Sequence, residues 1–122
     1  LTVIEGSSVF AAQLKEKYPT VRVIQSLFEE TEMEERFDFI VLGHVLEHVA
    51  NPVLLLTQIK KWLAPGGKLL CAVPNAQSLH RQAAVEMGLL ESIFSQSEKD
   101  IHHGHMRIYN PQTFKEDFLK AG

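Results

Sequence analysis

Histidine and glutamate residues between positions 44 and 48 have a spacing that could bind a metal ion. His44, Glu47 and His48 form an H-x-x-E-H pattern, in which an inverted zinc peptidase holds zinc with two histidines and uses the glutamate as general base. On a helix the two histidines would share one face. However, an apolar run ends at Leu42 and Asn51-Pro52 starts another element, so little helix fits between them. A zinc peptidase through these three residues is therefore a minor alternative, and no metal site is predicted.

A second group of histidines occupies positions 102, 103 and 105. No cysteine and no H-x-x-x-H partner accompanies this group, so a surface loop is expected there. In the segment that follows, the alternate residues His105, Arg107 and Tyr109 would face one side of an extended backbone. Such a row could line a substrate pocket, in which Arg107 could hold an anionic group through two parallel hydrogen bonds.

Strand and helix signals alternate along the chain and predict an α/β fold with a parallel sheet. Strands are expected at residues 2–5, 21–24, 37–42 and 68–73. Helices are expected from Ser7 or Ser8 to Pro19, from Asn51 to about Ala64, over about 78–87, and after Asn110-Pro111, with residues 92–108 irregular. The nearly continuous apolar run 37–42 is typical of a central strand covered on both faces.

In parallel sheets, ligands bind outside the carboxyl ends of the strands, so the residues that follow each strand are candidates for function. Glu5 ends the first expected strand, and its two oxygens match the vicinal hydroxyls of a ribose; alternatively, it favours the helix N-terminus that follows. Leu27 and Phe28 follow the second strand and could flank an adenine ring, although core packing explains an apolar pair equally.

Composition limits the classes of protein that fit this chain. Its 122 residues form one domain at most, and 45% hydrophobic with 22% charged residues is ordinary for a globular protein. The net charge of −3 argues against sequence-independent binding of nucleic acid. A single cysteine fits a reducing compartment, and no apolar run is long enough to span a bilayer, so a cytoplasmic location is expected.

The run FDFIVLGHVLEHVANPVLLLTQIKKWLAPGGKLLCAVPN, residues 37–75, resembles class I S-adenosylmethionine-dependent methyltransferases. In that family an F-D-x-[IV]-V strand precedes an L-E-H segment, a D/N-P helix start, L-x-P-G-G and a strand ending in P-N. VIEGS, residues 3–7, resembles the family's second strand with its ribose-binding acid. The tail GHMRIYNPQTFKEDFLKAG, residues 104–122, is similar to members that methylate sugars, lipids or quinone precursors.

The resemblance implies a Rossmann-like fold, S-adenosylmethionine (SAM) as cofactor, and in-line transfer of its methyl group to a small-molecule hydroxyl or amine. It implies that the cofactor is bound by Glu5, Gly6, Ser7, Leu27, Phe28, Gly43, His44 and Val45. His48 corresponds to a histidine that faces the reaction centre in many members, and Glu47 is expected to fix the local turn by hydrogen bonding. His48 and His105 are the candidate bases, and Arg107 is the candidate anion-binding residue.

The resemblance also implies that residues 1–122 form a single partial domain, with a cofactor-side core at 1–75 and substrate-side helices and a loop at 76–122. The family's first strand with its glycine-rich loop would precede Leu1, and its closing β-hairpin would follow Gly122. Two apolar strand edges would then pair with each other, with a second copy in a homodimer, or with residues outside this sequence. The alternative function is a non-catalytic Rossmann-like interaction module.

Overall fold

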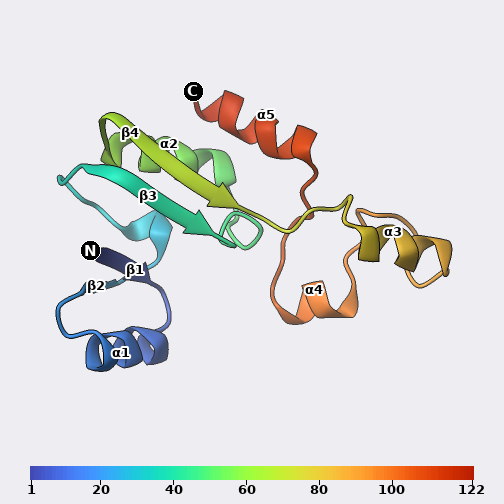
Figure 1. Ribbon diagram of the computed structural model, residues 1–122, viewed down its shortest axis with the longest axis horizontal. Coiled ribbons are helices and arrows are strands. Elements are labelled where there is room, and N and C mark those ends of the chain that lie inside the picture. Colours follow the sequence, from blue (N-terminus) through green and yellow to red (C-terminus); the bar gives the residue numbers. More distant parts are fainter. The chain divides into compact units, whose positions relative to one another are not determined.

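The computed structural model describes all residues from Leu1 to Gly122, and the chain divides into two compact units (Figure 1). Unit 1 comprises Leu1–Glu34 and unit 2 comprises Glu35–Gly122. The sequence predicts a division by function, with a cofactor side at residues 1–75 and a substrate side at residues 76–122. The two units are defined by compactness instead, so this functional division stays a prediction. None of the helices has the length and apolar character needed to cross a membrane.

Unit 1 is a βαβ unit, as the sequence predicts. Strand β1 (Thr2–Glu5) runs parallel to β2 (Arg22–Gln25), and helix α1 (Ser8–Lys17) connects them. Helix α1 begins there because the Ser7 side chain accepts a hydrogen bond from the backbone N–H of Phe10. A 3₁₀ turn, η1 (Phe28–Glu30), follows β2. The carboxyl ends of β1 and β2 therefore lie side by side, because Glu5 pairs with Gln25.

Unit 2 contains a second parallel pair, β3 (Phe37–Gly43) and β4 (Leu63–Ala72), connected by helix α2 (Pro52–Trp62). The start of α2 is set by Asn51, whose side chain accepts a hydrogen bond from the N–H of Leu54 at 3.0 Å, and by proline in the first turn. Helix α2 packs against β4, and α5 (Pro111–Ala121) packs against α2. The buried face of α2 consists of Pro52, Leu55, Leu56, Ile59 and Trp62.

The strand pairs form separate two-stranded sheets, β1 with β2 and β3 with β4. The prediction that β3 is covered on both faces is wrong. Phe39 and Val41 are 73% and 71% exposed, whereas Leu42 on the opposite face is buried. The physical reason is that successive side chains of a strand point to opposite faces, and α2, which packs against β4, covers one face of the sheet.

Strand β4 begins at Leu63, earlier than the predicted start at residue 68. Phe37 pairs with Leu63 and Phe39 pairs with Lys68, so residues 64–67 bulge out of the ladder between those pairs. A Cβ atom on Gly67 would lie 2.8 Å from the carbonyl oxygen of Phe37, which no side chain tolerates. The Pro-Gly-Gly sequence therefore both ends the helix and allows the close approach of the two strands.

The segment after β4 carries three helices. An isolated parallel bridge joins Asn75 to Tyr109, and α3 (Leu79–Glu86) and α5 occur where the sequence predicts them. The prediction that residues 92–108 are irregular is wrong at α4 (Glu98–His102). A capping box forms this short helix, because Ser97 and Asp100 exchange side-chain and backbone hydrogen bonds.

Leu55→Ala tests the core contact of α2. Leu55 is fully buried, so truncation leaves a cavity and is expected to lower the free energy of unfolding by about 2–5 kcal/mol. The matched control is Leu54→Ala, on the same helix but 58% exposed, which should change it by less than about 1 kcal/mol. Urea titration followed by circular dichroism measures both; equal midpoints would contradict the assigned face.

Candidate functional site

The chain leaves β3 through a tight turn rather than a helix. The N–H of His44 donates to the carbonyl of Ala72 at 2.8 Å, and His44 then adopts a left-handed conformation with φ of 56°. The N–H of His48 donates to the carbonyl of Val45 at 2.9 Å. His44 and His48 therefore do not share a helix face. The helical scaffold that the zinc-peptidase alternative requires is absent from residues 44–48.

Glu47 is the buried centre of this turn, with 1% of its surface exposed. Its Oε1 lies 3.2 Å from Nδ1 of His44, and its backbone carbonyl accepts a hydrogen bond from the N–H of Met106 at 2.7 Å. The expectation that Glu47 fixes the turn by hydrogen bonding is confirmed. Its second oxygen, Oε2, is buried and has no hydrogen-bond partner. A buried carboxylate oxygen without a partner is energetically costly, so it marks a position where a further group could bind.

Arg107 binds the backbone of the turn after β3. Its Nη1 donates to the carbonyls of Leu46, at 2.8 Å, and of Val49, and its Nη2 donates to the carbonyl of Ala50 at 3.0 Å. Three of the five guanidinium N–H groups are thus bound to carbonyls of this turn, and the bidentate grip on an anionic group stays a prediction that concerns the remaining N–H groups on Nε and Nη2. Arg107 holds the turn against the segment that contains it.

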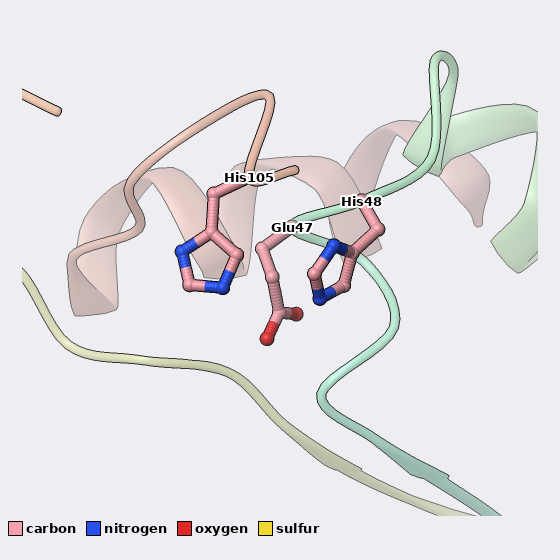
Figure 2. A group of neighbouring side chains, drawn as sticks. All are labelled: Glu47, His48 and His105. Carbon is pink, nitrogen blue, oxygen red and sulfur yellow. The ribbon is translucent and has the colours of Figure 1, made fainter. Parts of the chain in front are cut away.

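His48 and His105 lie next to each other, with ring centroids 4.8 Å apart and planes at 73°. Figure 2 shows the Glu47 side chain extending between the two imidazole rings. Nδ1 of His48 lies 3.3 Å from the carbonyl oxygen of Gly104, and Nδ1 of His105 lies 2.9 Å from Oδ1 of Asp100. The structure therefore unites the two histidines that the sequence singles out separately.

Asp100 is a positioning residue that the sequence reasoning missed. Its Oδ2 accepts hydrogen bonds from Arg81 Nη1 at 2.9 Å and from Ser97 Oγ at 2.7 Å. Burial alone would raise the pKa of Asp100, but hydrogen bonds from Ser97, Arg81 and His105 outweigh burial and hold this pKa well below its usual range. Asp100 is therefore a carboxylate that orients His105. The S-x-x-D spacing signals its cap, but no local pattern reveals Arg81 as its partner.

The predicted cofactor residues of unit 1 gather at the carboxyl ends of β1 and β2. Oε1 of Glu5 accepts a hydrogen bond from the N–H of Ser7 at 2.8 Å, which closes the turn into α1. A Cβ atom on Gly6 would lie 3.2 Å from Cδ2 of Leu27, so glycine allows this leucine to lie close over the turn. Leu27 remains half-exposed, and Phe28 begins η1.

The predicted cofactor residues of unit 2, Gly43, His44 and Val45, follow the end of β3. No atom lies within 4 Å of the position that a Cβ on Gly43 would occupy. The fold of this chain therefore does not itself explain glycine at position 43, and the space above its backbone is open to a ligand.

A shallow hollow of about 280 Å³ lies at the end of β4. It is lined by Cys71, Ala72, Val73, Pro74, Asn75, Tyr109, Asn110, Pro111 and Phe114. Burial and the nearby Glu47 raise the pKa of Cys71 to about 11, so this thiol is not a nucleophile near neutral pH. Burial and Asp117, which accepts the Tyr109 hydroxyl at 2.8 Å, raise the pKa of Tyr109 far above its usual range. Both groups remain protonated.

Arg107→Ala tests the contact that holds the turn. Three backbone carbonyls would lose a charged donor, so the free energy of unfolding is expected to fall by about 2–4 kcal/mol. Arg36→Ala is the matched control, because Arg36 donates a single 3.4 Å hydrogen bond from an exposed position. Chemical denaturation of both variants measures the difference, and equal losses would contradict the role assigned to Arg107.

The chain is similar to known methyltransferases. The profile of a family described as a methyltransferase domain matches residues 4–122. A ubiquinone biosynthesis O-methyltransferase from Cereibacter sphaeroides is 44% identical over 41 residues, which are 34% of this chain and 17% of that protein. The chain thus matches less than one fifth of the length of that curated relative.

Solved structures support the same fold. A SAM-dependent methyltransferase from Thermotoga maritima superposes with a TM-score of 0.74 at 20% identity, over 99% of this chain and 53% of that chain. A coclaurine N-methyltransferase bound to N-methylheliamine and S-adenosylhomocysteine (SAH) is 27% identical, with a TM-score of 0.54, over 57% of this chain and 22% of that chain. With nearly its whole length matched by the family profile, the chain belongs to the methyltransferase domain family and has its Rossmann-like fold.

Proposed function

We propose that this protein transfers a methyl group from SAM to a small-molecule acceptor. The proposal rests on where the polar and glycine residues of this protein lie. Glu5 and Gly6 lie at the carboxyl end of β1, and Gly43 and His44 lie at the carboxyl end of β3, where parallel sheets bind ligands. The family match across residues 4–122 supports the same reaction class. SAM, when bound, supplies a methyl group that is activated by the positive charge on sulfur.

The residues present fit such a cofactor. Glu5 offers a carboxylate directly after β1, in the position suited to ribose hydroxyls, with Gly6 and Ser7 forming the turn beside it. Leu27 offers half-exposed apolar surface after β2, suited to an adenine ring with Phe28 next to it. Unit 2, taken by itself, has open space over Gly43 that suits a ligand, with His44 and Val45 continuing the same backbone.

His48 and His105 are proposed to line the reaction centre on the acceptor side. They follow β3 and α4, and their rings are in contact. An imidazole is suited to accept the proton of an acceptor hydroxyl near neutral pH. Most of the catalytic effect would come from aligning acceptor and methyl group, which can contribute up to about 7–11 kcal/mol.

A hydroxyl of a sugar, lipid or quinone precursor is the acceptor we favour over an amine. The support is the pair of imidazoles, which an unprotonated amine acceptor would not need, and the 41-residue likeness to ubiquinone biosynthesis O-methyltransferases. A cytoplasmic location is part of the same proposal.

Titration calorimetry with SAH tests the cofactor class, because absence of heat at high ligand concentration would favour a non-catalytic interaction module.

Gly43→Ala tests the cofactor surface without disturbing the fold. The added methyl group meets no protein atom within 4 Å, so the free energy of unfolding should stay within about 1 kcal/mol of the parent value. The same methyl group would occupy space assigned to the cofactor, and SAH affinity is expected to fall at least about tenfold, which corresponds to about 1.4 kcal/mol. Calorimetric titration measures it, and unchanged affinity would remove Gly43 from the site.

His48→Ala tests the proton-transfer role in the same protein. Turnover with a hydroxyl acceptor is expected to fall by about 10²–10⁴-fold, because a positioned base contributes that much. His80→Ala, an exposed histidine on α3, is the control and should retain full turnover. Steady-state kinetics with labelled SAM measures both variants. Unaltered turnover in His48→Ala would show that His48 is not the base.

A further inference from the structure

We propose that Glu47, His48 and His105 form a binding site for a divalent first-row transition-metal ion. Each residue offers one ligand atom, and these three atoms all lie within 4.8 Å of one another. In Figure 2, nitrogen atoms of both rings and the carboxylate oxygens of Glu47 point toward a common space. This set differs from the H-x-x-E-H reading of the sequence, because His105 takes the place of His44.

The hydrogen bonds of the two rings leave the Nε2 atom of each ring free to bind a metal ion. Nδ1 of His105 faces the carboxylate of Asp100, and Nδ1 of His48 faces the carbonyl oxygen of Gly104. Both partners only accept hydrogen bonds, so each Nδ1 carries the proton and each Nε2 presents a lone pair. A carboxylate behind a histidine is also the usual outer partner of a metal ligand, since it fixes the ring and makes Nε2 a stronger donor.

Glu47 supplies an independent indication of a missing partner. Its side chain is almost wholly buried, one oxygen is bound by His44, and Oε2 has no hydrogen-bond partner. Native proteins rarely leave a buried carboxylate oxygen in this state. A cation beside Oε2 would satisfy this oxygen and compensate the buried negative charge.

The protein itself holds the two ligand-bearing segments together. The N–H of Met106 donates to the carbonyl of Glu47 at 2.7 Å, and Arg107 binds the carbonyls on either side of Glu47 and His48. Metal–ligand bonds of about 2.0–2.2 Å place neighbouring ligand atoms about 3–3.5 Å apart. Binding therefore requires the three side chains to close by roughly one ångström, while the backbone stays as it is.

The donor set indicates the class of ion. Two imidazoles and one carboxylate suit Zn²⁺, Fe²⁺, Co²⁺ or Ni²⁺, whereas Mg²⁺ and Ca²⁺ prefer sets made of oxygen alone. Three protein ligands leave at least one position open for water. If the proposed function holds, an oxygen of the acceptor could take that position, where the ion would lower the pKa of the acceptor hydroxyl so that its proton leaves to water, and no imidazole base would be needed.

Zinc titration of the EDTA-treated full chain tests the site, with calorimetry for affinity and native mass spectrometry for stoichiometry. One ion per chain is expected. Glu47→Gln and His105→Gln should each weaken Zn²⁺ binding at least about 100-fold. His102→Gln is the matched control, because His102 is exposed in the same segment and should leave affinity unchanged. Bound Co²⁺ should show an absorption spectrum of nitrogen and oxygen ligation.

Three outcomes would overturn the site: no stoichiometric Zn²⁺, equal affinity in Glu47→Gln and the parent, or loss of binding in His102→Gln alone. Because His105→Gln also removes a partner of Asp100, thermal unfolding should accompany each titration. His48→Gln provides a second variant. It removes a proposed ligand whose ring is half-exposed, and it leaves the hydrogen bond between His105 and Asp100 intact. SAH titration in the presence of EDTA separates the two proposals, because it reports the cofactor site without the metal.

Discussion

The guanidinium of Arg107 is the contact on which the candidate site depends. It donates to the carbonyls of Leu46, Val49 and Ala50, which the turn after β3 leaves outside any strand ladder. Hydrogen bonds from a charged donor are roughly twice as strong as neutral ones, and here they join residues 61 positions apart, Leu46 and Arg107. By fixing this turn, Arg107 brings Glu47 and His48 beside the segment that carries His105.

The turn is short because both of its ends are fixed by local chemistry. The left-handed backbone of His44 redirects the chain as β3 ends, and Asn51 with Pro52 starts α2 a few residues later. The intervening residues have no room for a helix, so Leu46, Glu47 and Val49 turn inward and are buried. A constraint of the fold, rather than a metal-binding helix, therefore produces the H-x-x-E-H spacing.

Local signals made much of the fold predictable from sequence. Asn51-Pro52 and Asn110-Pro111 mark helix starts by capping chemistry, and apolar runs mark the strands of each βαβ unit. The candidate site was predictable only as separate residues. The pairing of His48 with His105, the carbonyl partners of Arg107 and the Arg81–Asp100 ion pair depend on contacts between distant segments, which residue types and spacing do not encode. Helix α4 was missed because its single short capping box lies among polar residues.

The hydrogen bonds of the two Nδ1 atoms require both imidazole rings to present an unprotonated Nε2 toward Glu47. Two-dimensional ¹H–¹⁵N correlation of the histidine rings, with metal removed and the pH high enough for neutral imidazole, reads the tautomer of each ring directly. We expect the Nδ1–H tautomer for His48 and for His105, since their Nδ1 atoms donate to Gly104 and Asp100. An Nε2–H tautomer in either ring would contradict it.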